Sequence, residues 1–321
     1  MASSTKTVET TTTTPRTGFR FQNVGLFLLM AIVLGGAFPA VKAGLEFLPP
    51  VLFAAFRFTL AGVLILGYAI VTSDRWRPRT RNDWTAVFAA GVFSMGGIGL
   101  AFIGQQFTTA GIAAIIFSLS PILTPIIAWP LLADERLSRR GIIGILVGFV
   151  GVGIVVQPNP AAFGSTLVGQ SLILCATVSV TLGSVLIRRS GPTMSVVALT
   201  GWAMLIGATI QYGFSIALGE SLSMVRLTPT AVVIVLYLAV VASGIGFVIY
   251  YVLLERFGPL EVNLVTYVIP VVATLVGWAV LGETITAAAV VGFLVIAAGF
   301  ALLKYRELVA VIPHVRKAAT R

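Results

Sequence analysis

A series of apolar segments, each long enough to cross a lipid bilayer as a helix, constrains this chain more than any other feature. A hydrocarbon core about 30 Å thick needs roughly 20 apolar residues in an α-helix. Short polar stretches such as "PRTRND", "RRSGP" and "GETIT" separate the apolar segments. The sequence predicts ten spans, near residues 24–44, 50–71, 84–104, 110–132, 140–156, 166–187, 195–217, 230–253, 259–281 and 286–303. The fifth and tenth segments are short, so nine and eleven spans are the alternatives.

The composition excludes an ordinary soluble domain. Hydrophobic residues make up 58% of the chain and charged residues 10%, whereas soluble domains carry about 25% charged residues. The net charge of +10 comes from arginines and lysines in short loops, without the basic and aromatic face that nucleic-acid binding requires. We therefore expect an all-α polytopic membrane protein that contacts the lipid bilayer and no nucleic acid.

The positions of the positive charges predict the orientation. With the N-terminus placed in the cytoplasm, the 21 lysines and arginines fall on the cytoplasmic side except Lys42, Arg57 and Arg226. This bias follows the positive-inside rule, and a miscounted span would scramble it. We therefore expect ten spans with cytoplasmic N- and C-termini, in a multi-pass protein of the cell (cytoplasmic) membrane.

One phrase of the sequence occurs twice. "SPILTPIIAWPLL" at residues 120–132 returns as "IPVVATLVGWAVL" at residues 269–281, so that Pro121 and Pro270 lie 149 positions apart. The tripeptide "GIG" also occurs twice, at residues 97–99 and 244–246. These echoes predict two homologous halves of five spans each. The expected parts are a disordered tail, the first repeat, the second repeat and a basic tail, at residues 1–22, 23–156, 166–306 and 307–321.

An odd number of spans in each half reverses the orientation of equivalent helices. The two halves then form a 5+5 inverted-topology repeat, an arrangement typical of secondary transporters that bind substrate near the midplane between the halves. The alternative is a duplicated scaffold without a transport role.

The duplicated chain resembles the EamA-domain members of the drug/metabolite transporter superfamily. The phrases that carry the resemblance are "LPPVLFAAFRF", "PILTPIIAWPLLADERLS" and "LERFGPLEVNLVTYVIPVVATLVGWAVLGETIT". It covers nearly the whole chain except residues 1–22 and the tail after residue 306. The resemblance implies a transporter that exports a small metabolite, an amino acid or similar solute, across the cytoplasmic membrane. Span one departs from the family pattern, because "LGGAFPAVKAG" lacks the aromatic residue that usually precedes the small ones.

The repeated prolines are candidate pathway residues. Pro121 and Pro270 lack an N–H, so each leaves a carbonyl four residues earlier unpaired, at Phe117 and Thr266. Membrane helices tolerate this where protein or a water-filled cavity supplies a partner. We interpret both prolines as kinks that line the pathway and flex during gating; a static packing kink is the alternative.

Arg57 is predicted to lie well inside a span. It stands seven residues, or about 10 Å, from the outer end of span two. Because a charge within the membrane is costly and generally functional, we expect it to receive a substrate carboxylate. A snorkelling or carbonyl-capping arginine is the alternative. Its counterpart in the second half is Trp202.

Further polar and aromatic residues near span ends and breaks are candidates for the pathway. They are Gln105, Ser118, Ser120, Trp202, Tyr250, Asn263 and Tyr267. Such side chains can hydrogen-bond a solute, although aromatic residues near span ends are often interface anchors. Glu261 is a candidate for proton coupling, with a helix-dipole contact in the first turn of span nine as the alternative.

Catalysis and metal binding are not expected. The one histidine, His314, lies in the C-terminal tail, and the one cysteine, Cys175, has no histidine near it in the sequence. We therefore expect no enzyme activity, no cofactor and no metal site. A channel for small solutes is the main alternative to a carrier. The GxxxG of Gly144 and Gly148 is compatible with packing within a monomer or with a homodimer.

Overall fold

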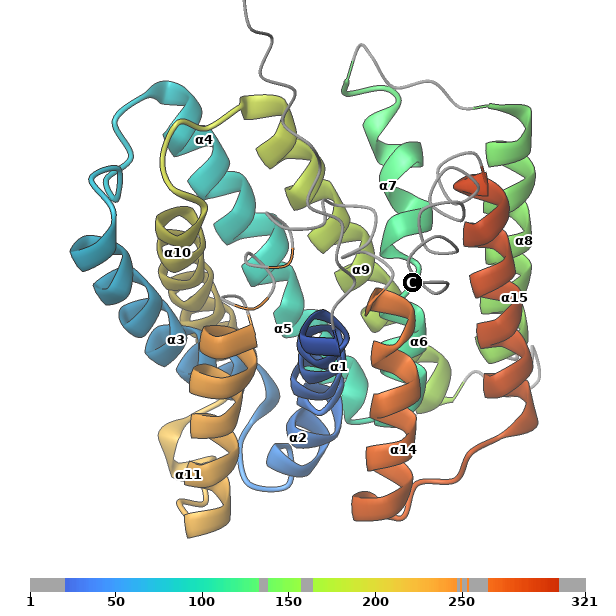
Figure 1. Ribbon diagram of the computed structural model, residues 1–321. Coiled ribbons are helices and arrows are strands. Elements are labelled where there is room, and N and C mark those ends of the chain that lie inside the picture. The colour runs from blue at the N-terminus through green and yellow to red at the C-terminus, as the bar shows by residue number, and fades with distance from the viewer. Residues whose placement is uncertain are drawn as a thin grey trace, which may run out of the picture.

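The computed structural model describes residues 21–132, 138–156, 164–246, 249, 253 and 265–305, and these residues form helices and no strand (Figure 1). In chain order the elements are α1 (Phe21–Gly35), α2 (Ala37–Gly44), α3 (Pro50–Thr72), α4 (Arg81–Ala89), η1 (Ala90–Gly96), α5 (Gly97–Gln105), α6 (Ala110–Phe117), α7 (Ser120–Ala128), α8 (Arg139–Val156), α9 (Ser165–Ser190), α10 (Val196–Ala217), η2 (Leu222–Met224), α11 (Pro229–Leu236), η3 (Tyr237–Ile245), η4 (Val265–Tyr267), α14 (Ile269–Leu281) and α15 (Ala287–Leu303).

Seven of the described helical stretches are long and apolar enough to cross a membrane. They are Gly25–Gly44, Pro50–Thr72, Arg81–Gln105, Ala110–Ala128, Arg139–Val156, Ser165–Ser190 and Val196–Ala217. Three shorter apolar stretches follow, Pro229–Ile245, Val265–Leu281 and Ala287–Leu303. The protein is therefore an all-helical, polytopic membrane protein, as its composition predicts.

Hydroxyl side chains define where several helices begin. Thr109, Ser195, Thr228 and Thr286 cap α6, α10, α11 and α15, each accepting a hydrogen bond from the backbone N–H three residues on. A cap of this kind stabilises a helix by about 1 kcal/mol. These polar residues thus set the position at which each following apolar helix starts.

Pro121 and Pro270 begin helices rather than kink continuous ones. α6 ends at Phe117, and α7 starts at Ser120 with Pro121 in its first turn. In the second half η4 and Val268 precede α14, whose first turn holds Pro270. The missing N–H of proline costs nothing in a first turn, because that group has no partner within the helix. The structure therefore has helix breaks where the sequence predicts kinks.

Two π-helical segments each adjoin one of the two "GIG" sequences. η1 runs directly into the first "GIG" sequence at residues 97–99, and η3 runs into the second at residues 244–246. A π-helical turn holds an extra residue and is frequent at functional sites.

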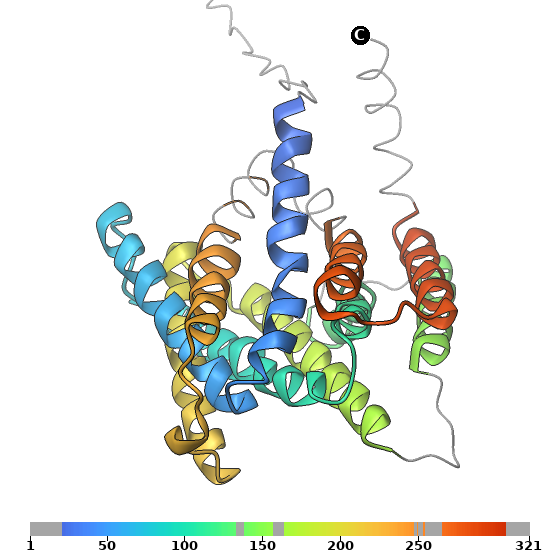
Figure 2. The same cartoon turned by 90° about the horizontal axis from the view of Figure 1, so that it is seen from below.

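Long helix pairs form opposite edges of the molecule, and α1 and α2 lie between them (Figures 1 and 2). α3 packs along α10 at one edge, and α8 packs along α15 at the other. Glycines bring the second pair close together. A Cβ on Gly144 would stand 2.5 Å from the Gly299 oxygen, and one on Gly151 would stand 2.8 Å from the Gly292 oxygen. Gly144 is thus used in packing within one chain.

Gly144→Ala is expected to destabilise the protein, because the added methyl group has no room between α8 and α15. Overpacking of this kind costs about 1–3 kcal/mol. The measurement is the melting temperature of the purified protein in detergent. Gly153→Ala on the same helix is the matched control, since nothing lies within 4 Å of a Cβ placed there. Equal melting temperatures for the two variants would contradict this packing.

Candidate functional site

One cavity lies at the break between α6 and α7, and we call it the Ser120 cavity. Its volume is about 540 Å³, which is in the range of small-molecule sites. Residues of α2, α6, α7, α9 and the start of α14 line it. They are Phe38, Ala114, Phe117, Ser118, Ser120, Pro121, Thr124, Ser184, Val185, Arg188, Thr266 and Ile269.

Hydroxyl groups hold the helix break in place. Ser118 is buried and donates through Oγ to the Ile115 carbonyl oxygen over 2.6 Å. Ser120 Oγ lies 2.9 Å from Thr181 Oγ1 of α9, within hydrogen-bond distance. The break is therefore tied both to its own helix and to the neighbouring one.

The ends of broken helices give the Ser120 cavity its electrostatic character. α7 and α14 both begin at its wall, at Ser120 and Ile269, and α6 ends there at Phe117. A helix N-terminus carries partial positive charge and a C-terminus partial negative charge. At the α6–α7 break the Ile122 and Leu123 N–H groups donate to the Leu119 carbonyl oxygen, so the helix dipoles supply this charge. One cavity thus offers favourable sites for an anionic and for a cationic group.

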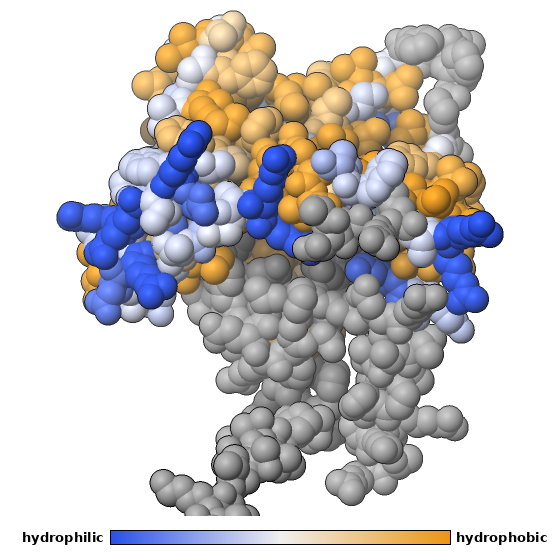
Figure 3. All heavy atoms as spheres, turned by 90° about the horizontal axis from the view of Figure 1, so that it is seen from above, coloured by the Kyte–Doolittle hydropathy of each residue, from blue (hydrophilic) through white to orange (hydrophobic). Residues whose placement is uncertain are grey.

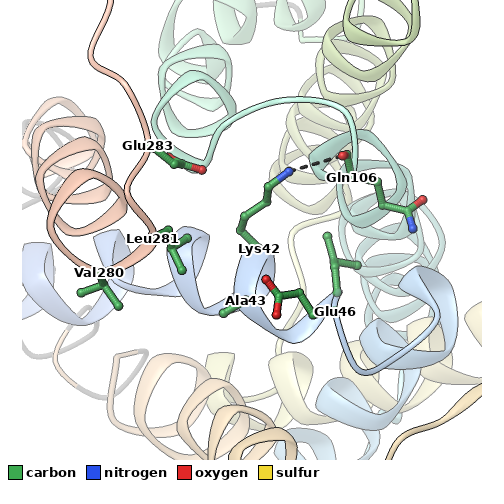
Figure 4. A pocket seen from close by; sticks show the side chains of 8 residues that line it. Lys42, Ala43, Glu46, Gln106, Val280, Leu281 and Glu283 are labelled. Atoms are coloured by element: carbon green, nitrogen blue, oxygen red, sulfur yellow. Dashed lines mark hydrogen bonds between the residues drawn. The ribbon is translucent and has the colours of Figure 1, made fainter.

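A second cavity, which we call the Lys42 cavity, lies at the far end of α2 (Figure 4). Its volume is about 570 Å³, and its lining residues are Lys42, Ala43, Leu45, Glu46, Gln106, Val280, Leu281 and Glu283. Lys42 Nζ donates to the carbonyl oxygens of Gln105 over 2.7 Å and Gln106 over 3.3 Å. The Glu283 carboxylate accepts from the Ala110 N–H at the start of α6, over 2.8 and 3.1 Å.

One face of α2 connects the two cavities. Phe38 lines the first and Lys42 the second, and residues four apart lie one above the other on a helix, about 6 Å along its axis. The Phe38 ring packs edge-to-face on Phe117, with ring centroids 5.7 Å apart. Both rings line the Ser120 cavity, and Phe38 forms its wall on the side of α2.

Arg57 lies on α3 and is not a lining residue of either cavity. Its Nε and one terminal nitrogen each lie 3.3 Å from Ser243 Oγ, which is buried in the π-helix η3. A guanidinium carries five N–H donors, and Ser243 is the one hydrogen-bond acceptor among the described residues. The Arg57 side chain is therefore hydrogen-bonded to the π-helical segment η3.

The other predicted residues are placed differently. Trp202 donates from Nε1 to the Trp76 carbonyl oxygen over 3.0 Å, which ties α10 to the loop after α3. Gln105 is buried below the Lys42 cavity, and its Oε1 has no partner among the described residues. The Tyr267 hydroxyl is likewise buried without a partner among the described residues. The Tyr267 ring lies tilted by 35° against the Phe300 ring, with the ring centroids 4.7 Å apart. Pro270 is buried beside Ile269.

Three predicted residues, Tyr250, Glu261 and Asn263, lie outside the described residues. Among the residues that are described, no three His, Cys, Asp or Glu side chains gather as metal ligands would.

Several lining residues escape the sequence reasoning. Phe38 carries no charge and stands in an apolar run, so nothing in the sequence distinguishes it from a packing residue. Thr266 enters the sequence reasoning only through the carbonyl that Pro270 leaves unpaired. The sequence does distinguish Lys42, because it is one of the few positive charges predicted on the side opposite the arginine-rich loops. The sequence also distinguishes Ser243, because it directly precedes the second "GIG".

Comparison with known proteins adds family information to this geometry. The model of the EamA-like transporter family matches twice, at residues 23–157 and 167–305. A "Probable amino-acid metabolite efflux pump" of Salmonella typhimurium is 28% identical over 298 residues, covering 85% of this chain and 92% of that protein. An "Uncharacterized transporter" of Archaeoglobus fulgidus is 28% identical over 265 residues, covering 80% of this chain and 90% of that protein.

A solved crystal structure has the same fold. It superposes with a TM-score of 0.63 at 20% sequence identity, and the match covers 90% of this chain and 99% of that one.

Phe38→Ala is expected to open the Ser120 cavity toward the Lys42 cavity, because Phe38 forms the α2 side of its wall one helical turn from Lys42. A cysteine introduced by Ser120→Cys, with Cys175→Ser to remove the native thiol, reports the opening. A membrane-impermeant maleimide added on the side of the Lys42 cavity should label this thiol when Phe38 is alanine and not otherwise.

Phe88→Ala is the matched control for the labelling experiment, since this side chain is 51% exposed on the protein surface. Equal labelling with Phe38 intact would contradict a closed contact between the cavities.

Proposed function

The chain belongs to the EamA-like transporter family. From this premise we propose that it is a secondary transporter that exports a small organic metabolite, an amino acid or similar solute. We propose that it carries this solute across the cytoplasmic membrane by alternating access. The family match confirms the resemblance seen in the sequence. The family and the named relatives are transporters and efflux pumps rather than enzymes.

The proposed architecture is ten spans in a 5+5 inverted repeat. In its support, α3 packs on α10, α6 on α14 and α8 on α15, and each pair joins a span to its counterpart five spans later. Other contacts occur in exchanged pairs, since η1 packs on α10 as η3 packs on α3. Gly144 and Gly151 of α8 meet Gly299 and Gly292 of α15, the crossing expected of two antiparallel copies of one helix.

The proposed orientation places both termini in the cytoplasm. The exposed arginines after α3, at the start of α8 and at the end of α9 support it, because these segments lie at one end of the molecule (Figure 1). Viewed from that end, hydrophilic residues form a band across the surface (Figure 3). Under the positive-inside rule this end faces the cytoplasm.

The Ser120 cavity is the observation that carries the proposal. It lies between helix breaks from both halves, and discontinuous helices of this kind form the substrate sites of secondary transporters. Opposite helix ends suit the carboxylate and ammonium groups of an amino acid, and Phe38 and Phe117 supply apolar walls. We propose that the halves rock about this site and that the Phe38–Phe117 contact opens on one side at a time.

Arg57 is proposed as a second recognition group for the substrate carboxylate. Ser243 occupies part of its donor set, and the remaining N–H groups suit a bidentate carboxylate. Gln105, Trp202, Tyr250, Asn263 and Tyr267 stay predicted pathway residues, and Glu261 stays the predicted proton-coupling group. The protein is proposed to work as a monomer or a homodimer. Export is proposed because the Salmonella typhimurium relative is named an efflux pump.

Flux from liposomes tests the proposed function. Liposomes that contain the purified protein are loaded with each of a panel of labelled amino acids. Saturable efflux that an unlabelled amino acid on the other side accelerates is expected of a carrier. Unsaturable flux with unitary conductance steps would favour the channel alternative, and flux no faster than from empty liposomes would refute transport of these solutes.

Arg57→Ala is expected to slow the flux of a transported amino acid about tenfold or more, because a charge-assisted contact to the carboxylate is lost. The initial rate in liposomes measures this effect, and gel filtration of the purified variant checks that it is folded. Arg75→Ala, at an exposed loop position, is the control. An unchanged rate in the folded Arg57→Ala protein would remove this residue from substrate recognition.

A further inference from the structure

We infer that the Lys42 cavity is a second binding site for the zwitterionic head of an α-amino acid, with Lys42 binding the carboxylate and Glu46 the ammonium group. The inference rests on the proposed function, since it places this site at the opposite end of the pathway from the Ser120 cavity. It assigns substrate recognition to residues outside the helix breaks.

Two backbone carbonyls hold the Lys42 ammonium group in place and leave one of its N–H donors for a ligand. Its ammonium group donates to the carbonyl oxygens of Gln105 and Gln106 at the C-terminal end of α5, where the helix dipole favours a cation. An ammonium has three N–H donors, and two of them are used by these described carbonyls. Lys42 is half-buried and extends into the cavity (Figure 4). The third donor is therefore suited to a ligand carboxylate.

The two carboxylates of the cavity have different tasks. Glu283 is committed to structure, because both of its oxygens accept from the Ala110 N–H. Glu46 is exposed, and its carboxylate makes no hydrogen bond or ion pair with a described residue. The Arg226 side chain binds the backbone carbonyl of Glu46 instead. Glu46 thus interacts electrostatically with Lys42 across the cavity, and its exposed carboxylate makes no described hydrogen bond that a cationic ligand group would have to displace.

The signs of these two charges suit a zwitterion. Glu46 follows Lys42 by four residues, in the turn directly after α2, and both side chains line the cavity. A carboxylate and an ammonium group on one carbon atom can bridge two such charges with a hydrogen bond to each. Leu45, Val280 and Leu281 form the apolar part of the lining, where an aliphatic side chain fits.

A cysteine placed in the cavity provides a test that is specific to this site. Ala43 lines the cavity, and Cys175 is the chain's one native cysteine. In the Ala43→Cys, Cys175→Ser protein, L-leucine is expected to slow modification by a charged methanethiosulfonate about tenfold or more at saturation. Isoamylamine, which lacks the carboxylate, and 4-methylpentanoate, which lacks the amine, should not protect at the same concentration.

Variants of the two charges complete the test. Lys42→Gln and Glu46→Gln, each added to the reporter protein, should abolish protection by leucine. Arg226→Gln is the matched control, because this charge is adjacent to Glu46 but does not line the cavity, and protection should persist.

The outcomes separate this inference from the proposed function. Protection that survives Lys42→Gln and Glu46→Gln, equal protection by the two analogues, or no protection by leucine would each overturn the second site. Leucine flux from liposomes, measured on the same proteins, reports on transport independently. Intact leucine flux without charge-dependent protection would thus refute the inference alone, whereas absent flux of every amino acid in the panel would refute the proposed function.

Discussion

The hydrocarbon core of a bilayer offers no hydrogen-bond partner to a backbone N–H or carbonyl, and the described structure follows from that constraint. A break in a spanning helix is stable where protein encloses it. The break before α7 is enclosed by α9 through the hydroxyl pair of Ser120 and Thr181, and Phe38 of α2 covers its other side. The Ser120 cavity lies among these same helices, beside the break.

Acidic side chains satisfy the same requirement at the ends of the helices, and they do so between the two halves. Glu220 accepts from the N–H groups of Val51 and Leu52 at the start of α3. Asp83 accepts from the N–H groups of Thr193 and Met194 ahead of α10. With Glu283 at the start of α6, three carboxylates bind backbone of the opposite half. These carboxylates join helix ends that lie far apart in the sequence.

The helices were predictable because apolar length and hydroxyl caps are local signals. Span two was expected at residues 50–71 and is α3, Pro50–Thr72. The site was only partly predictable. Pro121 and its neighbouring serines indicate an interruption of a helix, and in the structure they line the Ser120 cavity. Phe38 escaped notice because an apolar residue within an apolar run has no distinguishing neighbour in the sequence. The prolines were expected as kinks, since sequence position alone does not reveal that the preceding helix ends.

The sequence by itself determined a helical, polytopic membrane protein of the EamA-like transporter family, because apolar length and repeated phrases are properties of the chain alone. It also indicated which residues break the spans. The tertiary structure alone decided which residues meet. Arg57 hydrogen-bonds to Ser243 of a π-helix that is far from it in the sequence, and Trp202, its predicted counterpart, binds a loop carbonyl instead. The physical reason is that a pathway is built from facing sides of several helices, and their mutual rotation depends on packing that no single helix encodes.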